Sequence, residues 1–232
     1  MKVLGIDTST TSGSIGLIHD ERIVSEYILN LSVTHSERLL GAIDLVLRKA
    51  RYALEDLDGF TISLGPGSFT GVRIGVSTVK GLAFATGKPV AGVSTLDVLA
   101  SQISPTPYLI CPIIDARKGE VYSAFYRYEE LNRLKRLSEY QAIQPQVFCG
   151  ILKERTIFLG DGVKTYEDDL RNSLKSLAVF SPASLHIPHG SAVARLGVEL
   201  LLRGEVLDLA GFTPLYVRLS EAEINWRAKY PD

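Results

Sequence analysis

The chain has 232 residues, of which 46% are hydrophobic and 22% are charged, and its formal net charge at pH 7 is −1. These values are typical of a globular protein with one large or two modest domains. Proteins that bind tRNA or DNA by themselves usually carry a strongly basic surface, so this balance indicates that any nucleic-acid role requires a partner protein.

The two cysteines, Cys111 and Cys149, lie inside apolar stretches. We expect both to be reduced structural thiols, because two such residues provide neither a disulfide framework nor a metal-ligand spacing. No uninterrupted apolar run reaches the roughly 18 residues that a membrane-spanning helix needs, and no basic and apolar leader opens the sequence. These features predict a cytoplasmic protein that makes no membrane contact.

The first half opens with three runs of β-branched residues that polar turns separate, which predicts strands over 2–7, 14–19 and 22–29. The pattern then changes to alternating helices and strands. The expected elements are a helix over 34–50, a strand over 59–65, a helix over 70–86, a strand over 89–94 and a helix over 95–103. Gly87 and Pro89 mark the end of the helix over 70–86.

The second half repeats this order without visible sequence identity. The expected strands cover 107–115, 120–128, 134–143, 156–162 and 177–182, and the expected helices cover 145–152, 165–174 and 191–204. In each half the first strand ends in an aspartate, Asp7 or Asp115, and a tight polar turn follows.

A duplicated β-β-β-α-β-α unit is typical of the α/β superfold of actin, Hsp70 and sugar kinases, in which two ribonuclease-H-like halves face each other. We therefore predict a first lobe over 1–103 that carries the partner-binding helices, a smaller second lobe over 104–218 and a polar tail over 219–232. The last helix is expected to pack back on the first lobe. A fold of this kind does not by itself determine a function.

A glycine-rich stretch, "LGPGSFTGVRIG", occupies residues 64–75 between a predicted strand and a predicted helix. It resembles a phosphate-binding loop, but the P-loop pattern requires Gly-Lys-Ser/Thr, and the only Gly-Lys here precedes Pro89. The dinucleotide pattern also fails, because the third glycine, Gly71, comes one residue late. Since glycine inside a helix costs about 1 kcal/mol relative to alanine, we expect Gly71 and Gly75 to permit the close approach of another helix.

The helix over 34–50 has an apolar stripe, yet Leu40 and Leu45 lie outside it. Such a helix is either deeply buried in its own monomer or faces a partner. On the second interpretation, both helices contribute to one interface. Its predicted residues are His35, Leu39, Leu40, Ile43, Leu47, Gly71, Val72, Arg73, Gly75, Val76 and Val79.

Four strings, "LGIDTST" at the N-terminus, "GPGSFTGVRIG" at 65–75, "DARKGEVY" at 115–122 and "PLYVR" at 214–218, together resemble the TsaB family, also called YeaZ. The resemblance covers essentially residues 1–218. It implies a non-catalytic protein that pairs with its catalytic relative TsaD through its first two helices, which form a four-helix bundle with TsaD or with a second copy of this chain.

The resemblance also implies a wider complex. A third protein, the ATPase TsaE, joins the pair, and the complex transfers a threonylcarbamoyl group to N6 of adenosine 37 in tRNA. The chain would then meet tRNA only through the complex and form a homodimer when alone. We expect no cofactor on this chain alone, with ATP or ADP placed at the interface of the complex.

The residues provide little catalytic machinery. The catalytic relative binds its metal through an H-x-x-x-H pair, whereas here Leu39 stands four residues after His35. One imidazole cannot hold a metal alone, so we expect neither a metal site nor a catalytic residue. His186 and His189 flank a proline, and we expect no metal there either.

The aspartates leave two interpretations open. Because Asp7 and Asp115 each end a first strand, they could help bind a nucleotide together with Thr8, Ser9 and Lys118. Alternatively, each carboxylate bonds its own following backbone in an Asx turn. Two other functions also stay open at this stage, a stand-alone small-molecule kinase of the same superfold and a metallopeptidase of the glycoprotease type.

Overall fold

The β-branched runs of the first half form one five-stranded sheet in the computed structural model, which describes residues 1–30, 35–130 and 133–218. Its strands are β1 (Lys2–Asp7), β2 (Ser12–His19), β3 (Arg22–Asn30), β4 (Gly59–Ser63) and β5 (Val90–Val93). They lie in the order β3-β2-β1-β4-β5, with β4 parallel to β1 and β5 parallel to β4. β1, β2 and β4 are buried along nearly their whole length, which indicates that both faces of the sheet are covered.

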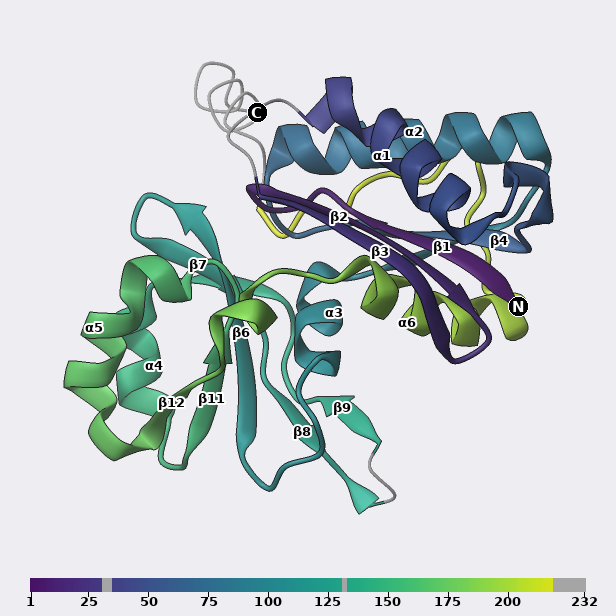
Figure 1. Cartoon of the computed structure of the whole chain (residues 1–232). Helices are drawn as coiled ribbons and strands as arrows, with labels where there is room; N and C mark the ends of the chain where they lie inside the picture. The colour runs from purple at the N-terminus through teal and green to yellow at the C-terminus, as the bar shows by residue number, and fades with distance from the viewer. Residues whose placement is uncertain (31–34, 131–132, 219–232) are drawn as a thin grey trace.

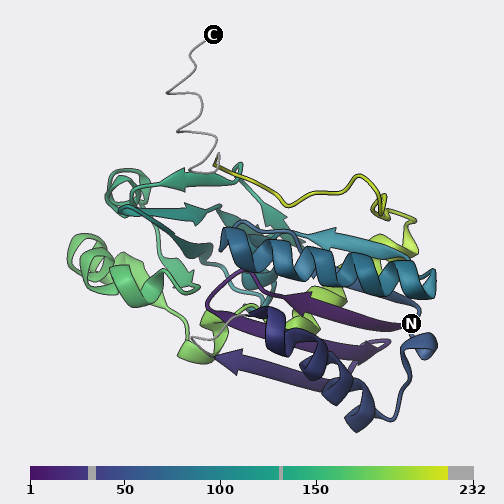
Figure 2. The same ribbon diagram turned by 90° about the horizontal axis from the view of Figure 1, so that it is seen from above.

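Two long helices, α1 (His35–Ala50) and α2 (Phe69–Thr86), cover one face of this sheet and lie side by side (Figures 1 and 2). α2 begins where the Ser68 hydroxyl accepts a hydrogen bond from the Gly71 amide. It ends at Gly87, whose φ of 68° is the left-handed conformation that favours glycine. A short 3-10 helix (Leu54–Asp56) lies between α1 and β4.

The second sheet has seven strands in the described part of the chain. They are β6 (Leu109–Arg117), β7 (Glu120–Ser123), β8 (Tyr126–Tyr128), β9 (Leu134–Arg136), β10 (Gln141–Ile143), β11 (Thr156–Leu159) and β12 (Ala178–Phe180). Five of them follow the order β10-β7-β6-β11-β12, which repeats the order of the first sheet. The predicted duplication is therefore visible in the topology.

The second and third strands of this repeat differ from the prediction. The runs over 120–128 and 134–143 are each divided into two strands, because β7 pairs with β10 whereas β8 pairs with β9. β8 also pairs with β6 at Ile110 and Tyr126, so β8 and β9 extend the sheet beside its central strand. The alternation pattern identified extended chain but not the place where it changes its pairing partner.

The described part of the chain has four further α-helices: α3 (Thr95–Ser101), α4 (Pro145–Ile151), α5 (Val163–Leu174) and α6 (Gly190–Leu202). Short 3-10 helices occupy Lys175–Leu177 and Ala183–His186. α4 and α5 pack over a core cluster of the second sheet that includes Phe148 and Phe158. This arrangement matches that of α1 and α2 on the first sheet (Figure 1).

The remaining two helices are exchanged between the lobes. α6 follows β12 in the chain, yet it packs against β1, β2, β4 and β5 on the face opposite α1 and α2 (Figure 1). α3 follows β5, yet its Leu96 and Leu99 are packed with Ile110 and Ile114 of the second sheet. The predicted boundary after residue 103 assigns α3 to the first lobe, and in the structure α3 contacts both lobes, because Val98 packs with Val93 of β5 and Val193 of α6.

Some sequence predictions fall on residues outside the described part, including the tail over 219–232 and the side chains of His35 and Cys149. Cys111 is buried beside Ser123, and burial raises the pKa of its thiol to about 12, as expected for an inert structural cysteine. Within the residues described, no helix has the length and apolar character needed to cross a membrane.

Candidate functional site

Gly71 and Gly75 of α2 do permit a close approach, but the neighbour is part of the same lobe. A Cβ atom at Gly71 would lie 2.1 Å from the carbonyl oxygen of Thr8, and one at Gly75 would lie 2.3 Å from the Thr8 hydroxyl. That hydroxyl donates a hydrogen bond of 2.7 Å to the Gly71 carbonyl. The predicted approach of a second helix at these two glycines is therefore wrong, because the turn after β1 already occupies the space.

Most of the apolar residues predicted to face a partner are also buried inside the monomer. Leu39, Ile43 and Leu47 of α1 and Val72, Val76 and Val79 of α2 belong to the core cluster between these helices and the first sheet, and none is more than 7% exposed. They fill the space over the sheet, so the folded chain cannot present them to another molecule. These six assignments are corrected, and the interpretation that buries the stripe within its own monomer holds for them.

The outward surface of the same two helices differs in composition. Phe84 of α2 is 86% exposed and Leu40 of α1 is 57% exposed, which is unusual for large apolar side chains. Gly41 and Gly81 lie on the exposed side of their helices, and a Cβ atom at either would meet nothing within 4 Å. We call the uncharged part of this surface the α1–α2 outer face, and it consists of Leu40, Gly41, Thr70, Ser77, Gly81, Phe84 and Ala85. The two helices also expose the charged residues Arg38, Asp44, Arg48, Lys49 and Arg73.

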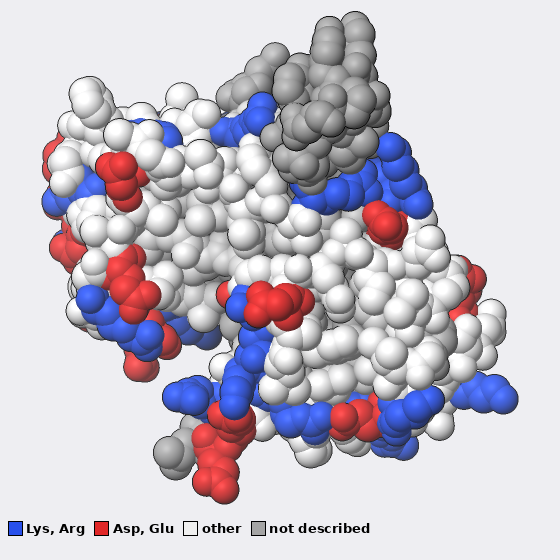
Figure 3. Space-filling model, turned by 180° about the vertical axis from the view of Figure 1, so that it is seen from behind, with Lys and Arg blue, Asp and Glu red and all other residues white. Residues whose placement is uncertain are grey.

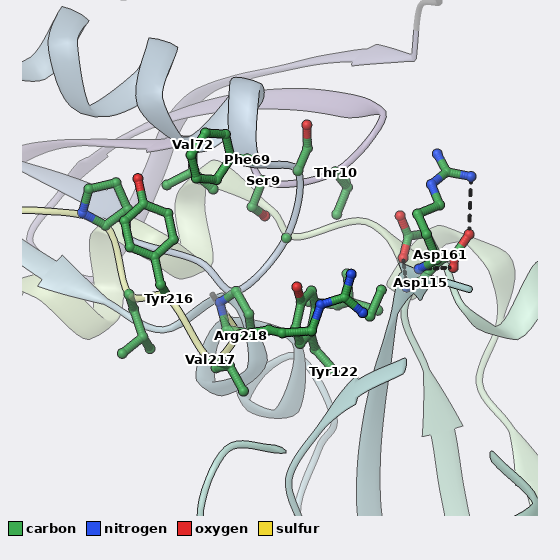
Figure 4. Close-up of a pocket in the computed structure, with 18 of the residues that line it drawn as sticks. Ser9, Thr10, Phe69, Val72, Asp115, Tyr122, Asp161, Tyr216, Val217 and Arg218 are labelled. Atoms are coloured by element: carbon green, nitrogen blue, oxygen red, sulfur yellow. Dashed lines mark hydrogen bonds and ion pairs between the residues drawn. The ribbon is translucent and has the colours of Figure 1, made fainter. Parts of the chain in front are cut away.

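A cavity of about 940 Å³ opens between the two lobes (Figure 4). Its walls come from the turn after β1, the loop before α2, the end of β6, the start of α5 and the segment 214–218. The polar and charged side chains on the walls include Ser9, Arg73, Asp115, Arg117, Tyr122, Asp161, Lys164 and Arg218. The two lobes thus bring together residues that are more than 200 positions apart in the sequence.

Asp7 and Asp115 both take part in local turns. The Asp7 carboxylate accepts hydrogen bonds from the Ser9 amide at 3.0 Å and from the Ser9 hydroxyl at 2.9 Å. Asp115 accepts one from the Arg117 amide at 2.8 Å, and the Arg117 guanidinium lies 3.3 Å from its other oxygen. Both are the Asx turns that the sequence left as one alternative.

The environments of the two carboxylates differ. Asp7 is fully buried, and this burial raises its pKa to about 6, against the opposing hydrogen bonds from the Ser9 amide and hydroxyl. Of the five residues considered for nucleotide binding, Ser9 and Asp115 line the cavity, whereas Asp7, Thr8 and Lys118 are not among the residues that line it. The cavity therefore gathers only part of the predicted set.

Sequence reasoning missed Asp161, which precedes α5 and lies beside Asp115 on the cavity wall (Figure 4). Its carboxylate accepts a hydrogen bond of 3.1 Å from the Asp115 amide. Burial raises its pKa, and the charge of Asp115 acts in the same direction. The apolar pattern predicts that "GDG" at 160–162 ends a strand, although glycines on both sides of an aspartate are typical of a turn.

The histidines of "LHIPHG" are engaged elsewhere. His189 Nδ1 lies 3.1 Å from Glu26 of β3, and His186 Nδ1 lies 3.3 Å from the Ser181 hydroxyl. Over residues 1–30, 35–130 and 133–218, no group of three or more His, Cys, Asp or Glu side chains is arranged to hold a metal ion. Seen from behind, the described surface carries Lys and Arg along its lower edge and in a further group at its upper right, whereas much of its middle is uncharged (Figure 3).

The chain is similar to known proteins over nearly its whole length. A family model described as "TsaD: tRNA N6-adenosine threonylcarbamoyltransferase" matches residues 23–226. The tRNA threonylcarbamoyladenosine biosynthesis protein TsaB of Bacillus subtilis is 35% identical over 229 residues, which cover 97% of this chain and 98% of the relative. The chain belongs to the TsaB family.

Solved structures support the TsaB family and the wider fold. YeaZ from Pseudomonas aeruginosa is 30% identical and superimposes with a TM-score of 0.78, covering 93% of this chain and 99% of the other. A polyphosphate/ATP-glucomannokinase from Arthrobacter is only 14% identical and has a TM-score of 0.50, so this likeness shows the fold alone. The molecule thus has the predicted superfold of actin, Hsp70 and sugar kinases.

Proposed function

We propose that this TsaB-family chain is a non-catalytic subunit that binds its catalytic relative, TsaD, through the α1–α2 outer face during synthesis of threonylcarbamoyladenosine in tRNA. The observation that carries the proposal is the exposure of Phe84 and Leu40 beside two helical glycines, Gly41 and Gly81. Glycine within a helix costs about 1 kcal/mol relative to alanine, and the chain's own packing gives no reason for either one. A second pair of helices placed against this face would provide it.

The chemistry of the chain is consistent with a supporting role. Leu39 takes the place of the second histidine in the metal-binding pair of the catalytic relative, and it is 3% exposed within the core. Leucine has no donor atom that could bind a metal ion. We therefore assign catalysis to the relative and the ordering of that relative to this chain.

The remaining members of the complex follow from the same assignment. We propose that the ATPase TsaE joins the pair, that ATP or ADP binds at an interface of the complex, and that tRNA is contacted through the complex. In the absence of the relative, the α1–α2 outer face would pair with that of a second copy. Because the complex acts on tRNA, we place it in the cytoplasm.

The Phe84→Arg variant tests the interface. Placing a charge at the most exposed apolar side chain of the α1–α2 outer face should weaken binding of the TsaD relative by at least roughly 30-fold, the loss expected for an interface hot spot. Isothermal titration with the full chain measures this. The matched control is Leu202→Arg, because Leu202 is 71% exposed on α6, which covers the opposite face of the sheet.

Wild-type affinity in Phe84→Arg would contradict the interface, provided that the circular dichroism spectrum of the variant is unchanged. The non-catalytic assignment is tested by a different measurement, the modification of tRNA by each protein alone and by both together. Product formed by this chain without the relative would contradict that part of the proposal.

A further inference from the structure

The segment that follows α6 crosses from one side of the first lobe to the other. We call residues 205–218 the strap. The Leu207 amide donates a hydrogen bond of 2.8 Å to the Val90 carbonyl at the edge of β5, and the Leu215 amide donates one of 2.7 Å to the Leu64 carbonyl. Between them, Phe212 is buried in the core beneath Lys80 of α2. Figure 2 shows the strap running along the outside of the first lobe towards the second.

The end of the strap is fixed to the first turn of α2. The Arg73 guanidinium donates a hydrogen bond of 2.8 Å from Nε to the Tyr216 hydroxyl. The same guanidinium lies 3.7 Å from the centre of the Phe69 ring, and the rings of Phe69 and Tyr216 are 5.3 Å apart. Three planar groups therefore hold the strap against the helix that carries Phe84.

Two residues further on, the strap reaches the second lobe. Arg218 Nη1 lies 2.9 Å from a carboxylate oxygen of Glu120, which begins β7. Their side chains are only 25% and 31% exposed, so water screens this ion pair less than a surface pair. Figure 4 shows Tyr216, Val217 and Arg218 in sequence along one wall of the cavity, with Tyr122 of β7 beside Arg218.

We propose that the strap couples the α1–α2 outer face to the second lobe, so that a partner bound on α2 changes how firmly β7 is held across the cavity. The connection is short and continuous: the first turn of α2, then Tyr216, then Arg218, then Glu120. Any such coupling is reciprocal, so loosening β7 must also loosen the first turn of α2. The identity of the partner rests on the proposed function, whereas the link between the lobes does not.

Hydrogen exchange of the free full-length chain tests the link directly. The Arg218→Gln variant removes the charge pair, and we expect amides in β7 and in the first turn of α2 to exchange about threefold faster or more. Glu120→Gln, which removes the other partner, should give the same response. The matched control is Arg203→Gln, because Arg203 pairs with Glu199 at the exposed end of α6 and should change neither region.

A second measurement adds the TsaD relative. Its binding should slow exchange in β6 and β7 of the wild type but not of Arg218→Gln, while α1 and α2 become protected in both. If Arg218→Gln leaves the first turn of α2 unchanged in the free chain, the coupling is overturned whatever the relative does. If that response is present but the relative protects no part of α1 or α2, the coupling stands and the proposed function fails.

Discussion

At the scale of single residues, glycines in α1 and α2 serve two opposite purposes. Gly71 and Gly75 are required because Thr8 lies where their side chains would be. Gly41 and Gly81 have open space beyond them, so the monomer does not need them. The same residue type in the same helix thus marks an internal contact at one position and a free surface at another.

This difference predicts opposite effects of alanine on stability. Gly71→Ala should lower the free energy of unfolding by about 1–3 kcal/mol, because the new methyl group collides with backbone that cannot move freely. Gly81→Ala should raise it by about 0.5–1 kcal/mol through the better helix propensity of alanine. Urea unfolding followed by circular dichroism measures both. Equal effects of the two substitutions would show that the contact with Thr8 does not restrict Gly71.

At the scale of elements, α3 shows how tertiary contacts assign a helix to a lobe. It leaves the first sheet directly after β5, but Asp97 accepts hydrogen bonds of 2.7 Å from Tyr126 of β8 and from Tyr140 before β10. Arg136 of β9 lies over the Tyr140 ring at 3.9 Å. This polar cluster attaches α3 to the added strands of the second sheet.

Removing the shared acceptor should be costly. Asp97→Ala leaves two largely buried hydroxyls without their partner, and we expect a loss of about 2–4 kcal/mol in the free energy of unfolding. Asp44→Ala, which removes an exposed ion pair with Arg48 on α1, should change it by no more than about 0.5 kcal/mol. Denaturant unfolding of both variants provides the comparison. A loss below 1 kcal/mol for Asp97→Ala would mean that water replaces the carboxylate.

At the scale of the whole molecule, the chain returns from the second lobe to the first at the start of α6, and polar contacts hold it there. The Glu26 carboxylate on the edge strand β3 accepts a hydrogen bond of 2.8 Å from the Ser191 amide at the start of α6. Its other oxygen lies 3.1 Å from His189 Nδ1. The hydrogen bond with Glu26 raises the pKa of His189. Burial alone would raise the pKa of Glu26, but the bonds from His189 and Ser191 lower it. The pair therefore fixes α6 to the first sheet while both groups are charged.

The pH dependence of the stability that this pair contributes follows from the directions of the two pKa shifts. The raised pKa of His189 contributes stability that is complete below its ordinary value of 6.5 and is lost as pH rises through the folded value. The lowered pKa of Glu26 contributes stability above its ordinary value of 4.5 that is lost as pH falls through the folded value. The destabilisation caused by Glu26→Gln should thus be largest between pH 4.5 and 6.5.

Unfolding of the wild type and of Glu26→Gln across this range measures the effect. Glu199→Gln, at an exposed position of α6, serves as the control. Its effect on the free energy of unfolding should show no maximum in that pH range. If the free energies of unfolding of the wild type and of Glu26→Gln differ by the same amount at acid and at mildly alkaline pH, the ion pair does not contribute.

Local patterns in the sequence determined much of this protein. The β-branched runs specified the strands, Ser68 and Gly87 set the ends of α2, and the duplicated order of elements identified the superfold, because each of these depends on neighbours a few residues away. Side-chain direction was not determined in this way. Val76 and Phe84 lie in the same helix, and only the sheet beneath it decides that one is 6% and the other 86% exposed.

The tertiary structure alone decided the contacts between distant segments. Thr8 against Gly71, Tyr216 against Arg73, and Arg218 against Glu120 join residues that no local pattern relates. The packing of α3 on the second sheet has the same origin, since the pattern of the sequence shows that a helix follows a strand but not which sheet that helix covers. Helix and strand formation is governed by local periodicity, whereas the choice between two available apolar faces is settled only when the whole chain packs.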